Sequence, residues 1–243
     1  MNWKGLFRFL KGLLLLGVLL GAAYWSVFRT DWFLITDFEV QANADERAWV
    51  EENYKTYFMG RHMFLVSLEE GADALRAEAV VRQARITRRL LHTLVYRIEY
   101  RLPTAAVWFD GMALLVDGEG YLVRTEPAVP EGMPVINGLK MDSFVVGRPL
   151  ETASGAQYKT ALELVSLMKS ASLDTAAVIT LEEHAVLVAL NSGLKGRFWY
   201  RGSIEDSFNR FMAVYNDQVS KGVSAGLIDV SSEGYPVYKP FGE

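Results

Sequence analysis

The chain contains no cysteine among its 243 residues. Disulfide bonds, thiolate metal sites, lipid attachment through cysteine and cysteine nucleophiles are therefore excluded. Histidine is almost as scarce, because His62, His92 and His184 are the only three and lie far apart in the chain. None has a second histidine or an acidic residue at a metal-ligand spacing. We expect each to be a surface or turn residue, and we expect neither a metal nor another cofactor.

The first 30 residues also lack any acidic side chain. All 29 Asp and Glu residues follow Arg29, together with all but four of the 25 Lys and Arg residues. The remainder of the chain therefore carries an excess of acid, which argues against nucleic acid as a partner, because phosphate binding needs a basic surface. With 51% hydrophobic and 22% charged residues, the composition allows a buried core.

One long run is free of charge, from Gly12 to Phe28. Its length lies near the roughly 20 apolar residues that a membrane-spanning helix needs. The preceding residues carry three basic side chains, whereas Arg29 is followed closely by Asp31. Because Lys and Arg stay on the cytoplasmic side, we expect a cytoplasmic tail over 1–11, a transmembrane helix over 12–29, and the bulk of the chain outside the cell membrane.

A cleavable signal peptide is the competing interpretation of this run, because Gly21-Ala22-Ala23 could precede a cleavage site. The bulky residues Tyr24 and Trp25 follow directly, where a cleavage site would be small and polar, so an uncleaved anchor is favoured. Gly17 and Gly21 match the small-xxx-small pattern of packed membrane helices, although ordinary glycines in a membrane helix would look the same.

The segment 33–101 changes its hydrophobic period several times. Alternation over 35–41 predicts a strand, and apolar residues at helical spacing predict a helix from 43–45 to Gly60. Ser67 with Glu70 fits a capping box, which predicts a helix to about Glu78. Two strands joined around 88–92 follow, and in the first of them alternation would place Val80, Ala84 and Ile86 on one face and Val81, Gln83, Arg85 and Thr87 on the other.

The segment 102–239 predicts a β-rich domain with two long helices, followed by a short tail over 240–243. Ser154 and Ser203 are the expected caps of the helices. The expected strands are 112–116, 121–123, 177–181, 185–190, 196–201, 226–230 and 235–238. The predicted fold class is therefore α+β with one N-terminal transmembrane helix.

The order strand, helix, helix, strand, strand directly after a span resembles a POTRA domain. The hairpin and its exit, Thr93 to Ile98 followed by Arg101-Leu102-Pro103-Thr104-Ala105, resemble the FtsQ/DivIB family of bacterial division proteins. Val135 to Gly138 and Ile228 to Ser231 resemble later segments of that family. The resemblance implies a non-enzymatic, single-pass scaffold at the inner (cell) membrane and division septum. It also implies FtsB/DivIC-like and FtsL-like coiled-coil partners, other division proteins of the membrane, and a role in septal peptidoglycan synthesis.

The last strand is the expected binding surface. Pro236 lacks an N–H and so favours an edge strand, to which another chain can add a strand. By position, the resemblance implies that the partners contact Ser231, Ser232, Gly234, Tyr235, Val237 and Tyr238.

Two further interpretations stay open. The chain could be a secreted or envelope-attached enzyme or ligand-binding protein docked through its POTRA segment, with Asp174, Glu182 and His184 as the first residues to inspect for a polar site. Separately, Arg82, Arg85, Arg88 and Arg89 form either a basic patch of unknown role or a charged, exposed sheet face.

Overall fold

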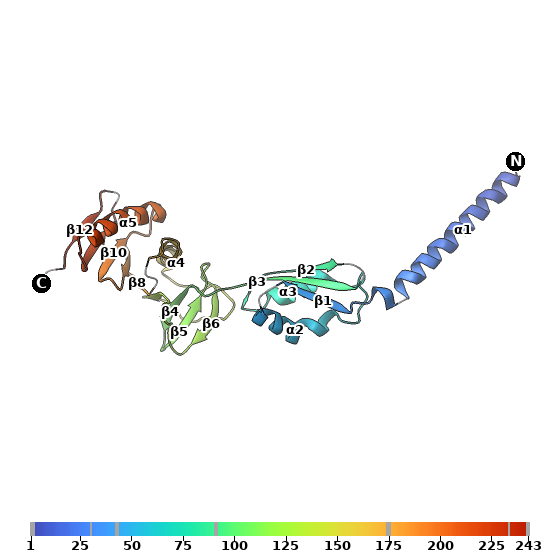
Figure 1. Ribbon diagram of the computed structural model, residues 1–243, viewed down its shortest axis with the longest axis horizontal. Coiled ribbons are helices and arrows are strands. Elements are labelled where there is room, and N and C mark those ends of the chain that lie inside the picture. Colours follow the sequence, from blue (N-terminus) through green and yellow to red (C-terminus); the bar gives the residue numbers. More distant parts are fainter. Residues whose placement is uncertain are drawn as a thin grey trace. The chain divides into compact units, whose positions relative to one another are not determined.

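The computed structural model describes residues 3–29, 31–41, 44–89, 92–173, 176–232 and 234–241. The chain divides into two compact units. Unit 1 comprises Met1–Ala77 and Val81–Tyr100, and unit 2 comprises Glu78–Val80 and Arg101–Glu243. The architecture is mixed α+β, with one apolar N-terminal helix, a small sheet in unit 1 and a large sheet in unit 2 (Figure 1).

Unit 1 begins with helix α1, Trp3–Phe28. Its window Phe9–Phe28 has a mean hydropathy of 1.7 and no buried residue, so the helix is long and apolar enough to cross a membrane. The helix begins inside the segment that we expected to be a tail, and Lys11 lies within the apolar window. Lys11 lies near the N-terminal end of this window, where a lysine can extend its ammonium group to the interface, so its position is compatible with a span.

The rest of unit 1 is a three-stranded sheet with helices. The strand order is β1-β3-β2, with β1 parallel and β2 antiparallel to β3. The Ser67 hydroxyl accepts a hydrogen bond from the N–H of Glu70 at 3.3 Å, so the predicted cap of the second helix is confirmed. The elements are η1 (Asp31–Phe33), β1 (Asp37–Gln41), α2 (Ala44–Phe58), α3 (Leu68–Arg76), β2 (Val81–Arg89) and β3 (Thr93–Tyr100).

Because of a β-bulge, the side chains of β2 do not alternate between the two faces of the sheet as predicted. The register against β3 shifts between Val81 and Gln83, and one extra residue in a strand reverses which side chains point inward. Val81 and Ile86, which strict alternation places on opposite faces, are therefore both buried. Burial also raises the pKa of the neighbouring Tyr96 hydroxyl to about 12, so this side chain stays neutral inside unit 1.

Unit 2 is built on one nine-stranded sheet. Its order is β12-β11-β10-β9-β8-β7-β4-β5-β6, and the connections β7 to β8 and β10 to β11 are parallel crossovers through the two helices. The elements are β4 (Ala105–Phe109), β5 (Met112–Val116), β6 (Leu122–Glu126), β7 (Val135–Asn137), α4 (Gly155–Ser170), β8 (Val178–Leu181), β9 (Val186–Ala189), β10 (Leu194–Phe198), α5 (Ile204–Ser220), β11 (Gly226–Asp229) and β12 (Val237–Lys239).

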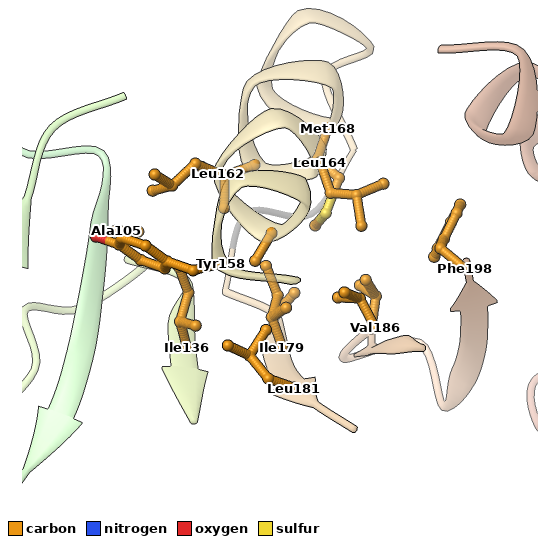
Figure 2. Close-up of a cluster of buried hydrophobic side chains, with 14 of the residues drawn as sticks. Ala105, Ile136, Tyr158, Leu162, Leu164, Met168, Ile179, Leu181, Val186 and Phe198 are labelled. Atoms are coloured by element: carbon orange, nitrogen blue, oxygen red, sulfur yellow. The ribbon is translucent and has the colours of Figure 1, made fainter. Parts of the chain in front are cut away.

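Both helices of unit 2 pack on the sheet through a common apolar core. Figure 2 shows Leu164 and Met168 of α4 above Ile179 and Val186 of the sheet, all buried. Phe198 and Phe211 extend this core toward α5, with ring centroids 5.3 Å apart. Over β4 and β5 a smaller cluster, Ala106, Ala113 and Leu115, is covered by Val129 and Met133 of the following loop.

Strands β4 and β7 of unit 2 were not predicted, and one of its two expected helix caps is absent. After β4, Asp110-Gly111 is nevertheless a typical hairpin turn in which both residues have positive φ, +46° and +80°. The cap of α5 is confirmed, because the Ser203 hydroxyl accepts from the N–H of Asp206 at 3.1 Å. The predicted cap of α4 was wrong, because the Ser154 side chain makes no capping hydrogen bond.

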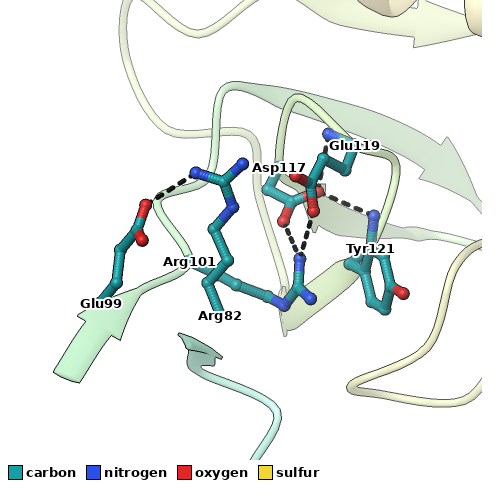
Figure 3. A network of polar contacts seen from close by, with 6 residues as sticks. All are labelled: Arg82, Glu99, Arg101, Asp117, Glu119 and Tyr121. Atoms are coloured by element: carbon teal, nitrogen blue, oxygen red, sulfur yellow. Dashed lines mark hydrogen bonds and ion pairs between the residues drawn. The ribbon is translucent and has the colours of Figure 1, made fainter. Parts of the chain in front are cut away.

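A buried ion cluster fixes the start of unit 2 to the turn between β5 and β6 (Figure 3). Arg101 forms a salt bridge with Asp117, and both side chains are at least nine-tenths buried. The other Asp117 oxygen accepts the N–H groups of Glu119 and Tyr121, each at 2.9 Å. The Arg101 guanidinium also lies 3.6 Å from the Tyr121 ring centroid. Arg101 therefore has a structural role, because a buried charge is stable only when it is paired.

The core of unit 2 makes a direct prediction about stability. Leu164 is fully buried beneath α4, so Leu164→Ala leaves a cavity and should lower the free energy of unfolding by roughly 2–5 kcal/mol. Thermal or chemical unfolding of the full chain in detergent, followed by near-UV circular dichroism, measures the change. The neighbouring exposed residue gives the matched control, Glu163→Ala. Equal stability of the two variants would contradict the packing described for α4.

Candidate functional site

The open edge of the large sheet is the candidate binding site. Strand β12 is the last strand in the sheet order, and β11 is its only neighbour among the described strands. The two are antiparallel, with Asp229 opposite Val237, Ile228 opposite Tyr238 and Leu227 opposite Lys239. Pro236 precedes the strand directly, so the expected edge position of this segment is confirmed.

The outer face of this edge carries exposed apolar side chains. Tyr235 is 94% exposed and Val237 is 48% exposed. Phe241 is exposed to a similar degree, and the ammonium group of Lys195 lies 5.3 Å from its ring centroid. We call Tyr235, Val237 and Phe241 the edge patch. Apolar side chains gathered beside unpaired backbone groups are typical of a surface that binds another chain.

Tyr238 points away from the edge patch. Side chains alternate along a strand, and Tyr238 shares the face of Ile228, which is fully buried. Its hydroxyl donates a hydrogen bond to the carbonyl oxygen of Ala225 at 2.8 Å. A Cβ at Gly226 would lie only 2.4 Å from the Tyr238 ring, so a side chain at that position would displace the ring. Tyr238, expected to contact a partner, therefore has a structural role through its side chain.

The turn before β12 is held by four hydrogen bonds, two to Asp229 and two from Arg210. The Asp229 carboxylate accepts the hydroxyl and the N–H of Ser231, at 2.6 and 3.1 Å. From α5, the Arg210 guanidinium donates to the carbonyl oxygens of Ser232 and Gly234, at 3.1 and 2.7 Å. These contacts fix the direction in which the chain enters β12. Ser231, Ser232 and Gly234 thus position the edge, and Ser231 and Ser232 also line a pocket beside α5.

Sequence reasoning missed Arg210. A basic residue in the middle of an amphipathic helix usually indicates a charge that faces solvent. The carbonyl groups that Arg210 binds lie more than 20 residues later in the chain. Glycine and serine in the turn gave only the general signal of a turn. No local pattern could have linked the two segments.

The acid Asp229 is the titratable group at the site whose pKa is shifted. Partial burial raises its pKa, but the hydrogen bonds from Ser231 and the nearby charge of Lys239 outweigh burial, so the net pKa lies below the ordinary value of 3.8. Its carboxylate is therefore ionised at neutral pH, with the Lys239 ammonium 3.5 Å away.

The four arginines of β2 do not form one patch. Arg82 is paired with Glu99 at 2.7 Å (Figure 3), and Arg89 is paired with Glu39. Arg88 donates instead to two carbonyl oxygens of the loop before α3. Arg85 is exposed and lies opposite Arg97 in the sheet. The interpretation as a charged, exposed sheet face describes β2 better than a single basic patch does.

The polar site of the alternative hypothesis is only partly within the described residues, because Asp174 lies outside them. Glu182 is paired with Arg197 at 3.0 Å. His184 is largely exposed beside Glu183. Over the described ranges no group of three or more His, Cys, Asp or Glu residues gathers as for a metal ion.

The remaining predicted residues lie in α1. Gly17 and Gly21 are one helical turn apart on one face, and a Cβ at either position would meet nothing within 4 Å. The face is therefore open in the structure of the chain by itself.

The lowered pKa of Asp229 predicts a pH effect on stability. A carboxylate whose pKa is lower in the folded state stabilises the fold fully above its unfolded pKa, and the contribution is lost as pH falls through the folded pKa. Unfolding of the full chain, measured at several values from about pH 6 down to about pH 2, should therefore show a weaker pH dependence for Asp229→Asn than for the wild type. Parallel curves would contradict the hydrogen-bonding role of the Asp229 carboxylate.

No known protein-family model matches the chain, and no curated protein matches it. Its function must therefore be inferred from its own residues and contacts.

Proposed function

We propose that the chain is a membrane-tethered, non-enzymatic scaffold of the FtsQ/DivIB type, which binds coiled-coil division proteins by strand addition at β12. The observation that carries the proposal is the combination of an open sheet edge with exposed apolar side chains at Tyr235 and Val237. An added strand gains main-chain hydrogen bonds along such an edge, and side-chain contacts give specificity.

The N-terminal helix supports the tethering part of the proposal. Its apolar window is preceded by basic residues and followed by a chain in which acid predominates. The positive-inside rule then directs the N-terminus to the cytoplasm and both units to the outer side of the cell (inner) membrane. The open face of Gly17 and Gly21 would be available to the membrane helix of another division protein.

The order of elements in unit 1 supports the assignment to a POTRA domain. Strand, two helices and two strands follow one another between Asp37 and Tyr100, and the first and last strands are neighbours in the sheet. Unit 2 then supplies a sheet that ends at the C-terminal strand, as expected for the β domain of such a scaffold.

A comparison of the edges supports β12 as the binding edge. In the described sheets the edge strands are β1, β2, β6 and β12. Each of the three others carries two or more charged residues, whereas β12 carries only Lys239: β1 contains Asp37 and Glu39, β2 contains four arginines, and β6 contains the ion pair Arg124–Glu126. Charges on an edge oppose the addition of a strand, whereas exposed tyrosine and valine favour it.

The edge assignment predicts the effect of two charged substitutions. Tyr235→Glu and Val237→Glu should each weaken pull-down of the cell's FtsB/DivIC-like coiled coil by about tenfold or more, because each puts a charge on an apolar contact. Circular dichroism should be unchanged, since both side chains are exposed. Thr125→Glu, at an exposed position of the opposite edge strand β6, is the matched control and should bind normally. Normal binding by all three variants would exclude β12 as the docking edge.

The division role makes a separate prediction for the cell. A fluorescent fusion of the full chain should gather at midcell, and depletion should produce filaments without septa. The Tyr235→Glu variant should still reach the membrane but should not restore septation. Normal septation after depletion would refute the division role, whatever the chain binds in vitro.

A further inference from the structure

Three exposed apolar side chains gather where α1 ends. Trp32 in η1 is 72% exposed, and Phe64 and Leu65 in the loop before α3 are 52% and 71% exposed. We call these three residues the exit patch. Nothing in the proposed scaffold function uses them, and large apolar groups at adjacent surface positions generally mark a contact with another molecule or with lipid.

Backbone hydrogen bonds hold the two segments of the exit patch together. The N–H of Ile35 donates to the carbonyl oxygen of Arg61 at 2.9 Å, and the N–H of Met63 donates to that of Phe33 at 2.7 Å. The rings of Phe33 and Phe64 also contact each other, with centroids 5.4 Å apart. Trp32 and the loop of Phe64 therefore belong to one local structure, although about 30 residues separate them in the chain.

His62 ties this local structure to the last turn of α1. Its Nε2 lies 2.7 Å from the carbonyl oxygen of Val27, which can only accept, so Nε2 carries the hydrogen. Its Nδ1 in turn accepts the N–H of Phe64 at 3.3 Å, and its ring stacks on Phe28 at 5.2 Å. The exit patch is thereby fixed at the end of the apolar helix.

The loop is also held from behind. Arg88 of β2 donates from Nε to the carbonyl oxygen of Met63 at 2.9 Å and from Nη2 to that of Val66 at 3.1 Å. The Met63 side chain, directly before Phe64, is fully buried, and the carbonyl oxygen of Val66, two residues after Phe64, is held by Arg88. Phe64 and Leu65 are therefore presented outward by an ordered loop, which lowers the entropy cost of inserting them into a lipid layer or another protein.

The chemistry next to the exit patch matches a lipid–water interface. Tyr24 and Trp25 are exposed in the last turns of α1, and aromatic rings of this kind prefer the headgroup level of a bilayer. The guanidinium of Arg29 lies 5.5 Å from the Trp25 ring centroid, and Arg61 lies at the same distance from the Tyr57 ring. Both cations can form ion pairs with lipid phosphates. Within η1, Asp31 is the one exposed acidic residue.

We propose that the exit patch inserts into the outer leaflet and forms a second membrane contact of unit 1, beside the span. This inference rests on the proposed function, because it requires α1 to cross the membrane. A single span leaves the domain after it free to rotate and tilt. A second contact, held to α1 through His62 and to the sheet through Arg88, would fix the orientation of the unit 1 sheet relative to the lipid surface.

The absence of cysteine makes the test simple, because one introduced cysteine is the only labelling site in the full chain. Leu65→Cys, labelled with the environment-sensitive dye NBD, is reconstituted in vesicles of phosphatidylcholine and phosphatidylglycerol that carry nitroxide-labelled lipids. The nitroxide is placed near the carbonyl end or near the methyl end of the acyl chain. Gln83→Cys is the matched control, because Gln83 is exposed in β2 near the end opposite the Arg88 clamp.

The expected result is a blue-shifted emission at position 65 and quenching by the nitroxide near the carbonyl end at least about twofold stronger than at position 83. Leu19→Cys, in the middle of the apolar window, tests the span separately and should be quenched most strongly by the nitroxide near the methyl end.

The outcomes separate the two proposals. Unquenched label at position 19 would refute the membrane span and with it the tethered scaffold. Quenching at position 19 with equal, weak quenching at positions 65 and 83 would refute the exit patch alone. A blue shift at position 65 that needs an added division protein and shows no quenching by lipid would also overturn it, and would assign the patch to a protein partner.

Discussion

The architecture of unit 2 depends on the short strand β7. Only Val135–Asn137 form it, yet it is the strand that joins β4 to β8 and so makes one continuous sheet. The N–H of Ala106 donates to the carbonyl oxygen of Pro134, and that of Val135 to Ala177, both at 2.9 Å. Ile136 is fully buried in the common core. Without this strand the sheet would separate into a β4-β5-β6 meander and a β8–β12 half.

The continuity of the sheet determines where an edge can be exposed. Helices α4 and α5 cover one face, and the loop with Val129 and Met133 covers the other over β4 and β5. At β6, the segment Gly147–Leu150 approaches the strand start, because the N–H of Gly147 donates to Leu122 at 2.7 Å. The C-terminal edge lacks such a cover among the described residues, and its turn is fixed by Arg210 and Asp229. Sheet order therefore leaves the outer main-chain groups of β12 without a neighbouring strand among the described residues.

Local features of the fold could be predicted from the sequence, and long-range ones could not. Ser67 and Ser203 marked helix starts because a cap needs only the next few residues, and period-two alternation found the hairpin of unit 1. The bulge at Val81 could not be predicted from the sequence, because it depends on how β2 pairs with β3. The strand order escaped for the same reason, since β4 pairs with β7 across almost 30 residues of sequence.

At the candidate site, too, local features could be predicted from the sequence and long-range ones could not. Pro236 indicated an edge strand correctly, and Tyr235 and Val237 were expected on the binding surface. The opposite orientation of Tyr238 follows from the alternation of a strand whose register with Ile228 is visible only in three dimensions. The exposure of Trp32, Phe64 and Leu65 was not predicted either, because apolar residues in a loop usually indicate a core contact.

Hydrogen exchange can detect strand addition at β12 at the level of single peptides. Amide exchange of the full chain is followed by mass spectrometry with and without the FtsB/DivIC-like coiled coil. We expect the peptide covering residues 235–241 to become strongly protected, because outward amides of the edge gain main-chain partners, while peptides of the opposite edge strand β6 stay unchanged. Binding that leaves residues 235–241 unprotected and protects another surface would contradict it.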